Sequence, residues 1–521
     1  MTVEKLGVIA VALLAAAVVL GRPPRVSERQ RGLALLAALV LTPALLLADI
    51  WHTSQLTHLR NQPAKAAAAV VLGLVVVAAL AVVIHRRPRA FPLLAIFALP
   101  FRLPIATGGS TSNLLIPLYL VVGAGALAYA VPRLPSALPG GLDPSSDGAP
   151  VAGWWARLAS PRGLEWLLAA SVVLYGLQAA YSADFTKALE NMVFFYVPFA
   201  LLFALLREVA WTRELLLQCL AVAVALAVVF AGIGFVEYHR KQLFLNPKVI
   251  AANQYSGYFR VNSLFFDPNI YGRFLALVMV GVTTAVMWSV RRREVLLGGG
   301  VLLWLLGGLV TSFSQSSIAA LLLGLAVLAA YRWDVRSTVY VTLALAAVAL
   351  VAVAVAPPSL HLGLSGKGGS ASNATSGRTK LIEGGLRLFA DRPLQGFGPG
   401  SFAQEYRARE HVTSTNAASA SHTIPITVAA EQGIVGLALY VALLVSAFAV
   451  LFRGAGRSPP RIALAACFAA LVLHTFTYAD FLEDPATWLL LGIGSALACA
   501  AGGGGGQRRS VPDMEPAALT S

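Results

Sequence analysis

The chain is dominated by apolar segments of roughly 15–25 residues, about the length that an α-helix needs to cross the hydrocarbon core of a bilayer. These segments lack the alternation of apolar and polar residues expected of a membrane β-barrel, and an open sheet cannot satisfy its backbone hydrogen bonds in lipid. Only 12% of the residues are charged, against about 25% in a soluble domain. The sequence therefore predicts an all-α polytopic membrane protein with about 12–15 transmembrane helices.

Fifteen candidate spans can be distinguished along the chain. They are residues 6–20, 32–50, 64–84, 91–107, 114–131, 163–182, 188–206, 214–236, 268–290, 295–312, 317–331, 338–356, 426–452, 461–479 and 485–501. The segment 91–107 is the weakest, because Pro92, Pro100, Arg102 and Pro104 interrupt it, and a re-entrant segment is the alternative. The first segment lacks a convincing cleavage site, which favours a spanning helix over a signal peptide.

The basic residues indicate how the chain is oriented in the membrane. The formal net charge of +15 does not suggest nucleic-acid binding, because Lys and Arg occur in short clusters between apolar segments rather than on one face. More than half of the 39 basic residues fall in alternate connections, such as 22–31, 207–213 and 291–293. By the positive-inside rule these connections are cytoplasmic, and the loops at 237–267 and 357–425 then face outward.

The organisation that follows has six parts. They are N-terminal transmembrane helices over 1–131, a cytoplasmic Pro/Gly-rich linker over 132–162, central transmembrane helices over 163–356, a large extracytoplasmic loop over 357–425, C-terminal transmembrane helices over 426–501, and a disordered cytoplasmic tail over 502–521. The three cysteines all fall in apolar segments and suggest neither a disulfide nor a metal site.

The two outer loops are unexpectedly rich in basic residues. Asp267-Pro268-Asn269 is a good helix start, with Asp267 as N-cap and proline in the first turn. That explanation does not cover Arg260, just before an apolar run, or Arg273, one turn inside an apolar helix. Because guanidinium groups pair with phosphate oxygens, a diphosphate is a natural partner for such arginines.

The long loop ends in two further segments of interest. The first contains Gly396-Phe397-Gly398-Pro399-Gly400, for which a structural turn is favoured over a phosphate cradle. The second begins with His422, whose imidazole suits general-base chemistry near neutral pH but also suits anchoring at the membrane interface. Small residues then follow at three-residue steps from Gly433, which predicts close helix packing. Glu431 is either a substrate-orienting acid or a buried, hydrogen-bonded one.

These segments together resemble the O-antigen ligase and O-antigen polymerase family. His422-Thr423, nine residues and Gly433-x-x-Gly436-x-x-Leu439 are similar to the family signature, in which Asn, Ser or Gln usually follows the histidine. The resemblance extends to the element Arg378–Ile382, the stretch PLQGFGPGSF, and an arginine before an Asp-Pro-Asn helix start, and covers roughly residues 250–450. A departure is Ser314-Gln315-Ser316, where the family commonly has Ser-Arg-Gly.

The resemblance implies a GT-C-like membrane glycosyltransferase of surface polysaccharide assembly, located in the cytoplasmic membrane with its active site facing outward. It would take a glycan from undecaprenyl diphosphate and pass it to the hydroxyl of a glycan or lipid-glycan acceptor, without a metal or other cofactor. Arg260 and Arg378 would hold the diphosphate, and His422 would deprotonate the acceptor. Asn269, Arg273 and Glu431 are candidates for orienting substrate. Ligation and polymerisation remain alternatives, because nothing in the sequence identifies the acceptor.

Two other classes of protein remain in consideration. A secondary transporter would also be polytopic, but residues 268–356 carry almost no ionisable side chain within the spans apart from Arg273, and ion-coupled carriers usually need such groups. The candidate residues also cluster toward the outer surface rather than the midplane. The third class is an assembly subunit without activity, which the departure at Ser314-Gln315-Ser316 leaves open.

Overall fold

The computed structural model describes residues 2–21, 27–50, 61–107, 110–135, 153–245, 259–333, 336, 371–410, 423–478 and 480–503. Within these residues the chain is helical apart from one short hairpin, and ten helices are long and apolar enough to cross a membrane. Two shorter apolar helices, Pro459–Thr475 and Pro485–Ala501, accompany them. The prediction of an all-α polytopic membrane protein is therefore confirmed, while the expected span at 338–356 lies outside the described residues.

Apart from α5 and the short α7, the helices of the first half follow the predicted spans closely. They are α1 (Val3–Leu20), α2 (Glu28–Ile50), α4 (Pro63–Arg86), α5 (Ala90–Ala98), α6 (Ile116–Ala130), α7 (Trp154–Leu158), α8 (Pro161–Ala179), α9 (Phe185–Asn191), the π-helix η4 (Met192–Tyr196), α10 (Val197–Arg207) and α11 (Arg213–Arg240), with a 3-10 turn, η2 (Val131–Arg133), after α6. Helices α9, η4 and α10 are continuous and together form one candidate span.

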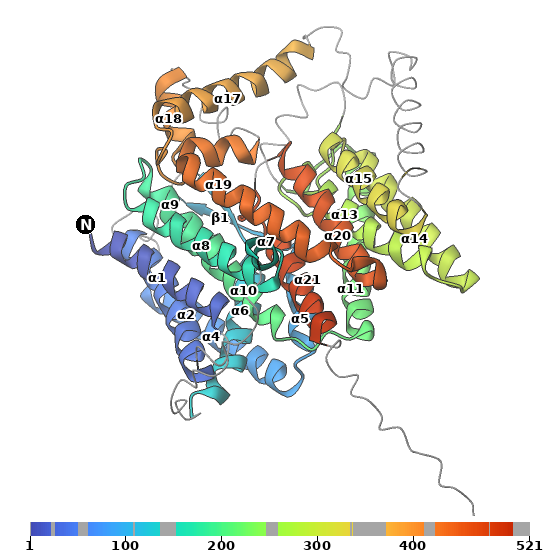
Figure 1. Cartoon of the computed structure of the whole chain (residues 1–521), viewed down its shortest axis with the longest axis horizontal. Coiled ribbons are helices and arrows are strands. Elements are labelled where there is room, and N and C mark those ends of the chain that lie inside the picture. The colour runs from blue at the N-terminus through green and yellow to red at the C-terminus, as the bar shows by residue number, and fades with distance from the viewer. Residues whose placement is uncertain are drawn as a thin grey trace, which may run out of the picture.

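The second half contains the remaining helices. They are α13 (Pro268–Met287), α14 (Arg292–Thr311), α15 (Gln315–Arg332), α17 (Ala371–Asp391), α18 (Phe402–Glu410), α19 (Ile424–Phe452), the 3-10 turn η6 (Ala455–Arg457), α20 (Pro459–Thr475) and α21 (Pro485–Gly503). Helix α20 lies at the centre of this half, because it packs against α13, α15, α19 and α21. Figure 1 shows α17 and α18 together at one end of the bundle, beside α19.

A single spanning helix over 91–107 is not what the chain forms. Helix α5 is only 9 residues long, and strand β1 (Leu103–Thr107) then pairs antiparallel with β2 (Ser110–Leu114). Pro100, which has no backbone N–H, follows Leu99, the C-cap of the helix. Phe91 lies against Gly125 while Arg102 lies near Tyr119, so this segment still runs antiparallel to α6.

Ion pairs join the connections that the positive-inside rule assigns to the cytoplasm. Arg31 pairs with Glu208 at 2.6 Å and Arg133 with Glu28 at 3.1 Å. A fully buried pair joins Arg207 to Glu165, between α10 and α8. Removing one member of such a pair leaves an uncompensated buried charge, so the pair ties these helices to one arrangement. Glu165 lies near the start of α8, whereas the Ala183 N–H, beyond its end, donates to the Phe397 carbonyl, so these connections lie at the other end of α8 from the Gly-Pro-rich turn.

Candidate active site

The first turn of α13 forms the base of the candidate site. Asp267 is extended and its Oδ1 accepts a hydrogen bond from the Asn269 backbone N–H at 2.6 Å, while Pro268 occupies the first helical position. This is the cap predicted from the sequence. The cap fixes the direction in which Asn269 leaves the helix.

Arg260 reaches this helix start from the preceding loop. Its Nε donates to the Ser312 carbonyl and its Nη2 to Asn269 Oδ1, each at 3.1 Å. The guanidinium is partly buried. The structure therefore brings together two of the side chains that the sequence singled out, and one of them orients the other.

A serine cluster at the start of α15 extends this network. Ser314 Oγ donates to Asn269 Oδ1 at 3.0 Å and lies 2.7 Å from Ser317 Oγ. Ser316 Oγ lies 3.2 Å from Nε2 of His474, which is fully buried on α20. The Ser314-Gln315-Ser316 segment, which lacks the cation common in the family, therefore joins Arg260 and Asn269 to a histidine. Sequence reasoning missed His474, although an ionisable residue near the end of a membrane helix is itself a functional signal.

Arg273 has a protein partner. Its Nη2 lies 2.5 Å from Oδ2 of Asp484, and both side chains are only 4% exposed. Asp484 lies in the connection from α20 to α21, which sequence reasoning did not single out. Within the described residues Asp484 therefore supplies the anion that a buried arginine needs, and a contact of Arg273 with substrate stays a prediction.

The Gly-Pro-rich turn is a docking element. Gly396, Gly398 and Gly400 all have positive φ, at 67°, 93° and 77°. The Gly398 N–H donates to the Glu431 carbonyl at 2.8 Å, and a Cβ at Gly396 would lie 2.3 Å from that same backbone. Only glycine fits such an approach. The turn binds the backbone of α19, which supports the structural interpretation over the phosphate cradle.

Glu431 belongs to the same docking contact. Its Oε1 accepts a hydrogen bond from the Phe402 N–H at 3.0 Å, at the first turn of α18. Of the two interpretations left open by the sequence, the hydrogen-bonded acid is therefore the one that the structure describes. Its carboxylate holds α18 against α19.

Gly433 does not serve the predicted helix packing. Its φ of 67° and ψ of −165° interrupt α19, and a Cβ would lie 2.4 Å from the Leu394 carbonyl oxygen. The freed Ile434 N–H donates to the Pro393 carbonyl at 2.7 Å. The glycine is thus required for a kink, and the expectation of a small-residue helix interface at Gly433 is wrong.

Two predicted site residues are only partly placed. The backbone of Arg378 belongs to α17, but its side chain is outside the described part of the chain. His422 is outside the described residues and directly precedes Thr423, the N-cap of α19. The roles of both residues stay predictions.

A pair of acids lies in the connection between α20 and α21. Glu483 accepts a hydrogen bond from Asn191 Nδ2 at 2.9 Å, beside the π-helix η4. Burial, and then the nearby charge of Asp480, raises the pKa of Glu483 from 4.5 to about 8. Burial also raises the pKa of Asp480.

This pair predicts a pH-dependent stability. Because the folded pKa of Glu483 is raised, the folded state holds more protons than the unfolded state between about pH 4.5 and 8. Stability should therefore fall as pH rises through that window. Glu483→Gln keeps an acceptor for Asn191 and should flatten the pH dependence of the apparent Tm. Glu190→Gln, at a solvent-exposed neighbour, is the control, and an equal flattening there would contradict this assignment.

Comparison with known proteins agrees with the resemblance seen in the motifs. Residues 300–441 match the family model described as O-antigen ligase. The matched segment contains the serine cluster, the Gly-Pro-rich turn and the kink at Gly433, whereas Arg260 precedes it and His474 follows it. No curated protein matches the chain. The many apolar helices and the matched segment therefore identify a multi-pass membrane protein in which residues 300–441 form an O-antigen ligase domain.

Proposed function

We propose that the chain is a glycosyltransferase that moves a glycan from an undecaprenyl-diphosphate carrier to an acceptor hydroxyl, at the outer face of the cytoplasmic membrane. The O-antigen ligase domain over residues 300–441 is the observation that carries this proposal. Asn269, which bonds Arg260, and the serine cluster lie at the starts of α13 and α15. The basic residues Arg291 and Arg332 lie beyond or at the other ends of these helices, which supports a site on the outer side.

In the proposed reaction, His422 takes the proton of the acceptor hydroxyl as its oxygen attacks the anomeric carbon of the donor. The new bond forms to that carbon while its bond to the diphosphate oxygen breaks. Undecaprenyl diphosphate leaves with the electron pair, and Arg260 and Arg378 stabilise the charge that builds on it. Arginines hold the leaving group in this proposal, without a metal.

The hydrogen bonds of Arg260 fit this role. The Ser312 carbonyl and Asn269 Oδ1 orient its guanidinium before substrate arrives. A donor held in place by the protein needs no reorganisation when charge develops on the leaving group. Asn269 is therefore proposed to position Arg260 rather than to contact the glycan.

The Arg260→Ala, Arg378→Ala double variant should bind a carrier-linked oligosaccharide at least about 100-fold more weakly than the wild type, since each charge-assisted hydrogen bond contributes roughly 1.5–3 kcal/mol. Binding to the purified protein and release of undecaprenyl diphosphate are the two measurements. The matched control is Arg86→Ala, Arg87→Ala at the opposite end of the bundle. Unchanged donor binding in the first variant would refute the diphosphate clamp.

A further inference from the structure

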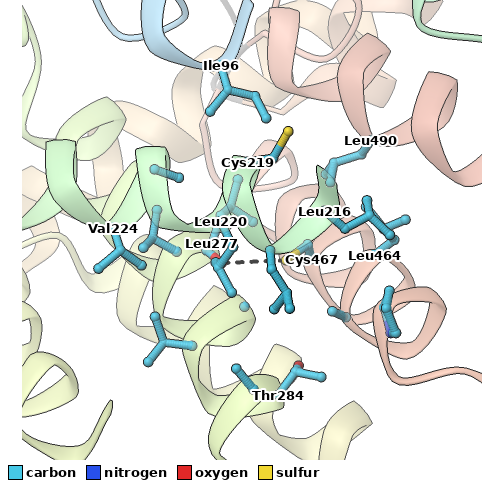
Figure 2. Close-up of a pocket in the computed structure, with 18 of the residues that line it drawn as sticks. Ile96, Leu216, Cys219, Leu220, Val224, Leu277, Thr284, Leu464, Cys467 and Leu490 are labelled. Atoms are coloured by element: carbon cyan, nitrogen blue, oxygen red, sulfur yellow. Dashed lines mark hydrogen bonds between the residues drawn. The ribbon is translucent and has the colours of Figure 1, made fainter. Parts of the chain in front are cut away.

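A large cavity lies within the helix bundle, on the other side of α13 from the serine cluster. It has a volume of about 1210 Å³ and is bounded by α5, α11, α13, α14, α20 and α21. Figure 2 shows apolar side chains of these helices around it, among them Leu220, Leu277 and Leu464. Its interior is therefore suited to hydrocarbon.

The cavity extends along most of the thickness of the hydrocarbon core of a membrane. Along α13 its lining runs from Ile270 to Val286, about 24 Å at 1.5 Å per residue. The hydrocarbon core of a bilayer measures about 30 Å. An apolar cavity of this length fits an extended hydrocarbon chain better than a water-soluble compound.

Charged side chains line both ends of the cavity. Arg213, Arg291, Glu294 and Arg457 lie at the end near the basic connections, and a second group lies at the end nearest the candidate site. Arg102, Arg273 and Asp484 contribute to its wall there. Arg102 lies in the non-helical segment between α5 and β1. Non-helical backbone at membrane depth is tolerated where it is buried in protein or lines a cavity. The break in the helix before Pro100, which shortens the predicted span, therefore places Arg102 in the wall of the cavity.

The neighbouring carboxylates determine whether Arg102 or Arg273 can bind an anion of a ligand. Asp484 pairs with Arg273, and Asp267 caps α13. Asp480 interacts electrostatically with both arginines, more strongly with Arg273 than with Arg102. Within the described part of the chain, no carboxylate forms an ion pair with Arg102. A phosphate that enters this end of the cavity can therefore approach the Arg102 guanidinium without breaking an ion pair.

We propose that this cavity holds the hydrocarbon chain of the lipid-linked donor and that Arg102 contacts the phosphate of that lipid at the cavity's outer end. The proposal rests on the proposed function. Asn269 and Arg273 lie one turn apart on α13, so the cavity's end adjoins the network that holds Arg260. Arg102 lies far outside the segment that matches the O-antigen ligase model, and it would add a contact from the front third of the chain.

The first test measures binding of undecaprenyl phosphate to the purified full chain by native mass spectrometry. Arg102→Gln should bind this probe about tenfold more weakly, the loss expected for one charge-assisted hydrogen bond. Arg102→Lys keeps the charge, and its affinity for the probe should lie between those of the wild type and Arg102→Gln. Arg89→Gln, an exposed arginine just before the same helix, should bind as the wild type does. Equal binding by Arg102→Gln and the wild type would overturn the proposal.

The second test fills the cavity. Gly281 lies on its wall, and a Cβ there would meet only the flexible end of Leu220 at 2.9 Å. Gly281→Leu should therefore leave the fold intact and weaken binding of undecaprenyl phosphate at least tenfold. Gly73→Leu on α4 is the matched control, because nothing lies within 4 Å of its Cβ position. If both variants bind undecaprenyl phosphate equally well, the cavity does not hold the hydrocarbon chain of the lipid.

A third test separates lipid binding from charge balance inside the protein. If Arg102 only neutralises Asp480, the double variant Arg102→Gln, Asp480→Asn should recover wild-type binding. The proposal expects that double variant to bind as weakly as Arg102→Gln alone, and Asp480→Asn alone to bind at least as tightly as the wild type. Recovery in the double variant would overturn the phosphate contact.

Two further outcomes separate this inference from the proposed function. Phosphatidylglycerol that competes equally with undecaprenyl phosphate would show an ordinary bilayer lipid in the cavity and overturn the chosen occupant. If the binding pattern appears as expected but no glycan is transferred from a carrier-linked oligosaccharide, the proposed function fails and the lipid site stands. If glycan is transferred but Arg102→Gln binds undecaprenyl phosphate as tightly as the wild type does, the lipid site fails and the proposed function stands.

Discussion

His422→Ala is expected to lower the rate of glycan transfer by about 10²–10⁴-fold, the usual contribution of a general base. The imidazole would take the acceptor's proton, and alanine leaves no group to do so. Release of undecaprenyl diphosphate from a carrier-linked oligosaccharide measures the rate. Donor binding should stay close to that of the wild type, because the diphosphate is assigned to Arg260 and Arg378.

The control variants use other histidines of the chain. His85→Ala, at the exposed end of α4, should leave the rate unchanged. His474 is not a candidate for the general base, because its side chain is fully buried and hydrogen-bonded to Ser316. Full turnover by His422→Ala would remove His422 from the mechanism.

Gly433→Ala should have the largest effect on stability. The backbone there has φ 67° and ψ −165°, a conformation almost restricted to glycine. A methyl group would also lie 2.4 Å from the Leu394 carbonyl oxygen, which is backbone and cannot rotate away. Backbone strain alone costs about 1–3 kcal/mol, and the clash adds to it. The loss of the kink should release the Gly-Pro-rich turn from α19.

The apparent Tm in detergent and the yield of monodisperse protein would measure this effect. Gly73→Ala is the matched control, since it lies in a helix with open space around it. Alanine is favoured over glycine there by about 0.5–1 kcal/mol, so this variant should be as stable as the wild type or more so. A Gly433→Ala protein with an unchanged Tm would contradict the role given to the kink.

Much of the fold follows from local sequence. The limits of the apolar segments predicted the helices to within a few residues, and Asp267-Pro268-Asn269 predicted the start of α13. The failures occurred where glycine or proline changes the backbone. At Gly433 a regular three-residue spacing concealed a kink, and at Pro100 an apolar segment became a short helix and a hairpin.

The sequence by itself predicted that the chain crosses a membrane many times, that its short basic connections share one side, and that the loops containing Arg260 and Arg378 face the other side. These properties follow from hydrophobic length and charge distribution, which act on each segment separately. The tertiary structure alone decided the partners of those charges. Asp484 pairs with Arg273, and His474 meets Ser316 from 158 residues away. Such contacts depend on which helices pack together, and local composition does not specify that order.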